Sequence, residues 1–167
     1  MALLNHETSE VIKITGCKSS IELVKILKKN KVIGLPEIVD FYQSVGTITN
    51  FHHNKAHAYL SILYLEPPHS AQEAIQEFCE LMMNSRIEAI QKGTFGKPVT
   101  QQDINRHSLI SALIYCEENP VLKQLVDAIR YLTVFIERVP NVKIDLLDPR
   151  DILQDSNGQL ILIDPVA

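Results

Sequence analysis

The chain has 167 residues, of which 46% are hydrophobic and 22% are charged, proportions that are ordinary for a soluble globular domain. Its formal net charge is −4 and its isoelectric point lies near 5.8, which argues against a nucleic-acid-binding protein, because such proteins carry a basic excess. No apolar run approaches the ~20 residues that a membrane-spanning helix needs, and the first residues lack the pattern of a signal peptide. We therefore expect a cytoplasmic protein, in the cell that makes it or in a host cell, that binds neither nucleic acid nor membrane.

The first 67 residues are predicted to form a small, mostly antiparallel sheet with one inserted helix. Residues 2–5 and 10–15 predict two short strands around a polar turn. Ser19 and Ser20 are expected to cap a helix over residues 21–30, which the glycine and proline at 34–36 then end. Two further extended runs follow, and a double proline ends the second. They cover residues 37–45 and 57–65.

The rest of the chain is predicted to be helical until its last residues. Helical periodicity covers residues 70–91, 100–118 and 121–139, and Thr100 with Asp103 predicts a helix start of the capping-box kind. Two short apolar runs close the sequence, joined by the strong turn signal Asp-Ser-Asn-Gly at 155–158. A sheet, then helices, then a terminal hairpin define an α+β protein.

The hairpin carries the candidate chemistry. Asp151 precedes its first strand and Asp164 follows its second, so both carboxylates lie at the open end of the turn-linked pair. Paired hard oxygen ligands suit Mg²⁺, which takes one or two carboxylates and otherwise keeps waters or phosphate oxygens. From spacing alone, the alternative that both residues are strand-end caps or ordinary surface residues stays equally open.

The segment from Asp151 to Asp164 resembles the metal-binding hairpin of protein kinases, in which an Asn ends the catalytic loop and an Asp opens the activation segment. Pro149 stands where kinases often have proline. The triplet at 164–166, Asp-Pro-Val, would replace Asp-Phe-Gly, a variant similar to that of short kinase-like proteins of bacteria and their phages. The resemblance implies a single kinase-like domain, with a small lobe over 1–67 and a truncated helical lobe over 68–167.

The same resemblance assigns roles to residues elsewhere in the chain. EVIKIT at 10–15 is similar to the kinase strand that carries the phosphate-binding lysine, which would be Lys13. Glu22 would be its ion-pair partner on the following helix. The implied ligands are ATP, with its adenine at the linker backbone, and Mg²⁺ at Asp151 and Asp164. The linker residues concerned are Tyr64, Leu65 and Glu66.

Several features depart from the kinase pattern. Twelve residues precede Lys13 and none is glycine, so the glycine-rich loop is missing. The position of the catalytic aspartate falls on Leu146, although Asp145 and Asp148 lie near it and are the candidate bases. Asp151 replaces the metal-binding Asn, and the chain ends at 167, directly after the metal-binding segment.

These departures predict a pseudokinase that binds a nucleotide with Mg²⁺, is weakly active or inactive, and acts through a protein partner. One alternative is an active serine/threonine-type phosphotransferase that uses Asp145 or Asp148 as its base. Another is an interaction module with a filled cleft and no ligand. The apolar strand within residues 160–167 is expected to be uncovered and to pair with a partner or with a second copy of the chain.

Overall fold

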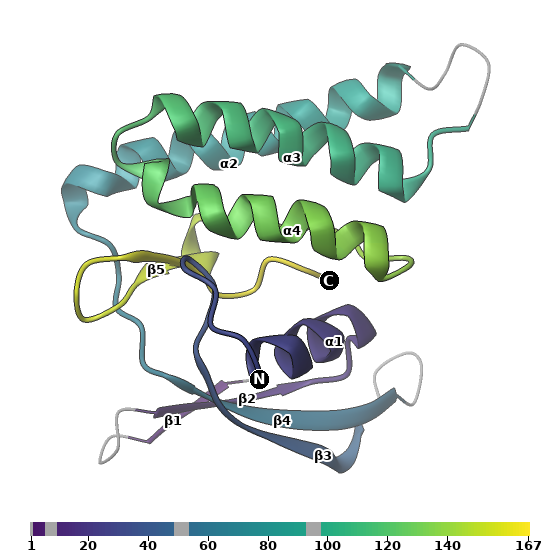
Figure 1. Ribbon diagram of the computed structural model, residues 1–167, viewed down its shortest axis with the longest axis vertical. Coiled ribbons are helices and arrows are strands. Elements are labelled where there is room, and N and C mark those ends of the chain that lie inside the picture. The colour runs from purple at the N-terminus through teal and green to yellow at the C-terminus, as the bar shows by residue number, and fades with distance from the viewer. Residues whose placement is uncertain (1, 6–9, 49–53, 93–97) are drawn as a thin grey trace.

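The computed structural model describes residues 2–5, 10–48, 54–92 and 98–167, and it is an α+β protein in two layers. A small antiparallel sheet and one helix form the lower layer in Figure 1, and three longer helices form the upper layer. The C-terminal hairpin lies between them. The predicted fold class, an antiparallel sheet with one helix followed by helices and a hairpin, is confirmed.

The sheet has the strand order β1-β2-β4-β3, and every neighbouring pair is antiparallel. All four predicted strands are present, although β3 extends past its predicted end and β4 begins before its predicted start. The expected polar turn at 6–9 lies outside the described residues, and so do residues 49–53 of the polar loop that the sequence predicts around Thr47 to Lys55. The strands are β1 (Ala2–Asn5), β2 (Glu10–Thr15), β3 (Ile38–Ile48) and β4 (Asn54–Ile62).

Helix α1 (Lys18–Leu27) starts three residues earlier than predicted, and its predicted cap is wrong. Cys17 is the N-cap and makes no capping bond with its side chain. Ser19 and Ser20 instead lie buried in the first turn. The Ser20 hydroxyl donates to the carbonyl of Val166 at 3.0 Å, a tertiary bond that competes with capping and that local sequence cannot reveal.

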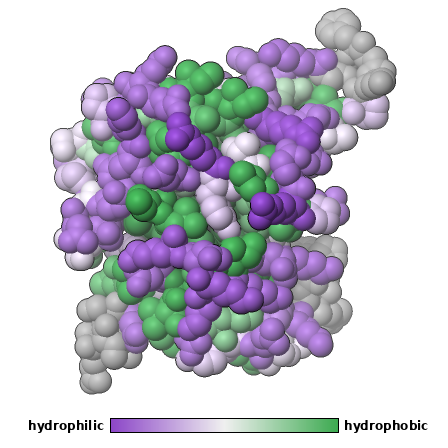
Figure 2. Space-filling model, in the orientation of Figure 1, coloured by the Kyte–Doolittle hydropathy of each residue, from purple (hydrophilic) through white to green (hydrophobic). Residues whose placement is uncertain are grey.

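The upper layer consists of α2 (His69–Lys92), α3 (Gln101–Glu118) and α4 (Val126–Arg138), which continues from a short 3-10 helix, η2 (Leu122–Leu125). The predicted capping box is confirmed, because Thr100 and Asp103 exchange side-chain-to-backbone bonds, both of 3.1 Å. Hydrophobic side chains remain visible among polar ones on the face of this layer that Figure 2 shows. Within the described residues, no helix is both long and apolar enough to cross a membrane.

The hairpin comprises β5 (Ile152–Gln154) and β6 (Leu160–Leu162), and a short 3-10 helix, η3 (Pro149–Asp151), leads into it. Leu160, Ile161 and Leu162 are only 1, 5 and 0% exposed. The expectation of an uncovered apolar strand is therefore wrong. Burying each such side chain is worth about 1.5–3 kcal/mol, and Leu160 and Leu162 join the main hydrophobic core.

Two sets of main-chain bonds fix the sheet layer to the hairpin. Leu65, after β4, exchanges both of its main-chain hydrogen bonds with Gln154, each of 2.8 Å. Leu162 donates to the carbonyl of Gly34 at 2.9 Å. Gly34 has a φ of +81°, and a Cβ there would lie 2.9 Å from the Cβ of Ala128 on α4, so this contact requires glycine.

Candidate functional site

Lys13 and Asp164 meet between the two layers. The Lys13 Nζ donates to the Asp164 Oδ2 at 3.0 Å across 151 positions of sequence. Lys13 lies on β2 opposite Tyr59 of β4, and Asp164 lies just beyond β6. Burial and the negative charge of Asp164 raise the pKa of the Tyr59 phenol, which stays neutral beside the ion pair. The structure therefore brings together two of the residues that the kinase resemblance selected.

Three carboxylates line one pocket of ≈ 200 Å³ beside this ion pair. Asp145, Asp151 and Asp164 come from three different segments, and Lys13 donates to one of them, Asp164. The other side chains of the pocket are small and come from the end of β2, from α1 and from the last residues of the chain. They are Thr15, Cys17, Ser20, Val166 and Ala167.

Asp151 has a carboxyl whose pKa is strongly perturbed by its surroundings. Partial burial and then the negative charge of Asp164 raise its pKa to about 6, and Lys13 opposes this shift. Its own carbonyl accepts a 2.8 Å bond from the amide of Ile163, which ties the start of β5 to the residue before Asp164. The hairpin thus holds both predicted metal ligands at its open end, as the sequence predicted.

Asp145 faces the same pocket because of an alternating pattern that the sequence prediction did not use. Val142, Ile144 and Leu146 are all buried, so the residues between them point the other way. Leu146 is 2% exposed and belongs to the core. The apolar–polar alternation of V-K-I-D-L at 142–146 could have selected Asp145 from the sequence alone.

Asp148 lies apart from this pocket and is held by a neighbour. Its two carboxylate oxygens accept bonds of 2.6–3.0 Å from the Arg150 guanidinium. It also accepts from the amide of Arg150, at the start of η3. These bonds lower the pKa of Asp148 to about 2, so this carboxylate is a much weaker proton acceptor than an ordinary aspartate. Of the two candidate bases, the geometry favours Asp145.

Glu22 is not paired with Lys13 as the resemblance implied. Its carboxylate accepts a 2.8 Å bond from Lys25 on the exposed side of α1. The residue that α1 presents to the pocket is Ser20, whose hydroxyl is bonded to Val166. Helical geometry explains the difference, because residues two positions apart on a helix point in different directions.

The three predicted linker residues have three different surroundings. Tyr64 lines an apolar slot of ≈ 210 Å³, and its phenol accepts a 2.7 Å bond from the amide of Glu37. Leu65 has both main-chain groups paired with Gln154, so its backbone is not free to meet an adenine, which corrects that expectation. Glu66 lies on another pocket. The slot lies beside Lys13 and is lined mainly by apolar side chains, namely Val11, Tyr59, Ile62, Leu63, Leu153 and Ile163.

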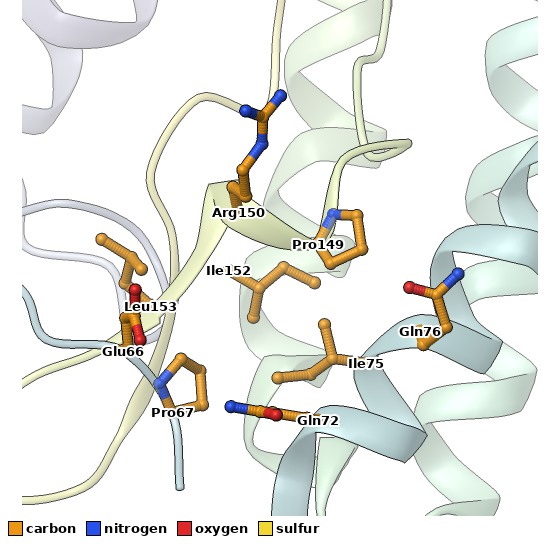
Figure 3. A pocket seen from close by; sticks show the side chains of 9 residues that line it. All are labelled: Glu66, Pro67, Gln72, Ile75, Gln76, Pro149, Arg150, Ile152 and Leu153. Carbon is orange, nitrogen blue, oxygen red and sulfur yellow. The ribbon is translucent and has the colours of Figure 1, made fainter. Parts of the chain in front are cut away.

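The largest of the pockets described, ≈ 450 Å³, contains neither Lys13 nor the three carboxylates. Figure 3 shows Ile75 of α2 and Ile152 of β5 pointing toward one another across it, while the Arg150 guanidinium points away. This pocket adjoins the apolar slot, because Leu153 lines both.

The carboxylate pocket offers hard oxygen donors, the kind of ligand that Mg²⁺ takes. In the described part of the chain, no three histidine, cysteine or acidic side chains converge as a ready-made ligand cluster. Mg²⁺ needs only one or two carboxylates and keeps its other positions for water or phosphate. A divalent cation would also offset the mutual repulsion that raises the pKa of Asp151.

Comparisons with known proteins add no family assignment. No protein-family model matches the sequence, and no curated protein matches it significantly.

Proposed function

We propose that this chain binds an adenine nucleotide together with Mg²⁺ in a kinase-like cleft. The observation that carries the proposal is the position of the Lys13–Asp164 pair. An apolar slot lies on the Lys13 side of this pair and a pocket of three carboxylates lies on the Asp164 side. A base, a phosphate-binding cation and metal ligands would thus follow one another in the order that a nucleotide requires.

Each group has a defined task in this proposal. The apolar walls of the slot would hold the base, and Lys13 would bind phosphate oxygens. Asp151 and Asp164 would hold Mg²⁺, which supplies positive charge against the phosphates when it is bound. The slot and the carboxylate pocket are each smaller than the ~300 Å³ at which ligand pockets usually begin, so a nucleotide would have to occupy both.

The proposed protein is a pseudokinase with weak activity or none. None of residues 1–12 is a glycine, so these residues do not offer the flexible glycine-rich cover that kinases place over the phosphates. Leu146 occupies the position of the catalytic aspartate and is buried. Nucleotide binding would then support a role that the protein carries out by contacting a protein partner. We assign no surface of the described residues to that partner.

A second candidate function is active phosphotransfer, and Asp145 is the observation that favours it. This carboxylate lines the pocket that also contains Asp151 and Asp164, so it is placed near the proposed metal. It could accept the proton of a hydroxyl acceptor there. The third reading, a ligand-free interaction module, requires a filled cleft, and the open slot beside Lys13 supports the nucleotide proposal instead.

A fluorescent ATP analogue tests the proposal directly. Its anisotropy should rise with the wild-type chain in Mg²⁺ and should fall when EDTA is added. Val11→Trp would fill the apolar slot without touching the carboxylates, and it should abolish this signal. Equal binding by wild type and Val11→Trp would show that the base does not enter the slot.

A further inference from the structure

Asn105 is a buried polar residue of α3 whose side chain makes three hydrogen bonds. It is 3% exposed. Its Nδ2 donates to the carbonyl of Val142 at 2.7 Å, and its Oδ1 accepts from the amide of Ile144 at 3.2 Å. The Gln101 side chain donates a further 2.9 Å bond to the same Oδ1 and so orients the amide. A buried amide is costly unless it is bonded in this way.

Asn105 replaces a neighbouring strand on one edge of the segment 142–145. The carbonyl of Val142 and the amide of Ile144 face the same side of an extended chain, where a partner strand would supply one donor and one acceptor. A single carboxamide offers both groups. The segment that leads to the candidate base is therefore held by a side chain on this edge.

The other edge of the same segment pairs with the residues that follow Asp164. Lys143 exchanges bonds of 3.1 and 2.8 Å with Ala167, and the amide of Asp145 donates to the carbonyl of Pro165 at 2.9 Å. The Ser20 hydroxyl then fixes the carbonyl of Val166 to α1. A continuous series of hydrogen bonds thus runs from α3 through the Asp145 segment and the Asp164 segment to α1.

We propose that Asn105 is a positioning residue for the candidate site, which fixes Asp145 and, through the paired segment 165–167, Asp164. It lines none of the pockets of that site and acts through the two segments alone. The effect of Asn105 on ligand binding rests on the proposed function, because the positions of the carboxylates matter only if Mg²⁺ and a nucleotide bind there.

The test compares Asn105→Leu with Ser111→Ala, two variants of α3. The control removes the 3.0 Å bond between Ser111 and Ser85 on the side that faces α2, away from the site. In Asn105→Leu, amide hydrogen exchange at Asp145 and Ala167 should accelerate about tenfold or more, since bonds worth ~1 kcal/mol each are lost. Exchange at Leu65 and Gln154, which pair elsewhere, should change less than about twofold.

Nucleotide affinity provides the readout that a purely structural role would not move. The titrations are made well below the unfolding temperature of both variants. The ratio of ATP affinity in Mg²⁺ to ATP affinity in EDTA should be about tenfold smaller for Asn105→Leu than for the wild type, while the affinity in EDTA should be unchanged. Gln101→Leu removes only the bond that orients the amide, so it should show a smaller change of the same kind and serves if Asn105→Leu does not fold.

Unchanged exchange at Asp145 and Ala167 would overturn the positioning role. So would accelerated exchange with an intact Mg²⁺-dependent gain, since the segments would then move without effect on the site. If the wild-type chain shows no Mg²⁺-dependent binding, the proposed function fails instead. The exchange measurement separates that failure from the failure of Asn105 to hold the two segments.

Discussion

The Nζ of Lys13 on β2 lies 3.0 Å from the Oδ2 of Asp164, beyond the end of the chain's last strand. The two side chains are 21% and 47% exposed. An ion pair with this much exposure contributes only about 0–1 kcal/mol to stability. The contact therefore adds little to the stability of the fold. In the proposed function its task is to bind a nucleotide between the apolar slot and the carboxylate pocket.

Replacing Lys13 by methionine should weaken MgATP binding by about tenfold or more, because one charge-assisted bond to phosphate is worth ~1.5–3 kcal/mol. Lys25→Met is the matched control, since Lys25 pairs with Glu22 on the exposed face of α1. Glu22→Gln should likewise leave the affinity within about twofold. Equal losses in Lys13→Met and Lys25→Met, measured by titration, would argue that Lys13 has no specific role.

Asp151→Asn should stabilise the protein at pH 7.5 in the absence of metal. The folded-state pKa of Asp151 is about 6, above the ordinary aspartate value of 3.8, so the folded protein binds this proton more tightly than the unfolded chain. The stability linked to that proton is complete below pH 3.8 and is lost as the pH rises through 6. We expect a gain of about 1 kcal/mol, discounted because the carboxyl is partly in water.

Urea unfolding of wild type and Asp151→Asn at pH 4 and pH 7.5 checks this sign. The advantage of the variant should appear only at the higher pH, and added Mg²⁺ should reduce it by stabilising the wild type. Asp148→Asn should behave in the opposite way, because Arg150 lowers the pKa of Asp148 to about 2 and its charge favours the folded state. A stability gain in both variants would contradict the electrostatic account of the pocket.

If the chain transfers phosphate, the two candidate bases should respond differently. Asp145→Asn should reduce the rate by about 10²–10⁴-fold, the range of general-base catalysis. Asp148→Asn should keep most of the activity, since Asp148 lies outside the pocket and is held by Arg150. Radiolabelled ATP with the chain itself and a general protein acceptor provides the assay. Loss of transfer in Asp148→Asn alone would reverse the assignment.

Gly34→Ala tests the contact between the sheet layer and α4. Both Gly34 and Gly158 have a φ of +81°, but only at Gly34 does an added Cβ meet another atom closely, 2.9 Å from Ala128. Gly158→Ala should cost about 1 kcal/mol for its backbone conformation, whereas Gly34→Ala should cost about 2–4 kcal/mol because the clash adds to that cost. Equal losses in thermal or urea unfolding would mean that the layers separate easily.

Local signals explain why most of the fold was predictable. The period of apolar residues predicts α2 and α3, and Thr100 with Asp103 fixes the start of α3 because both partners lie within one turn. The turn at 155–158 likewise predicts the hairpin, and with it the placement of Asp151 and Asp164 at one end.

Distant partners explain what the sequence did not show. Ser20 carries no local sign that its hydroxyl bonds Val166, 146 positions away. Leu65 carries none that its backbone pairs with Gln154. Asn105 reads as an ordinary polar residue of a helix, and only the structure shows that it is buried against the segment that leads to Asp145. Asp145 differs from these residues, because the apolar–polar alternation at 142–146 is visible in the sequence and predicts that its side chain points away from the core.

Isothermal titration of ATP into the wild-type chain and into Asp164→Ala, each with Mg²⁺ and with EDTA, tests the central claim most directly. We expect the wild type to bind with one site per chain, more tightly in Mg²⁺ than in EDTA, and we expect Asp164→Ala to lose that difference. No heat of binding at millimolar ATP, or the same Mg²⁺ dependence in Asp164→Ala, would contradict the assignment of a nucleotide and metal site to this cleft.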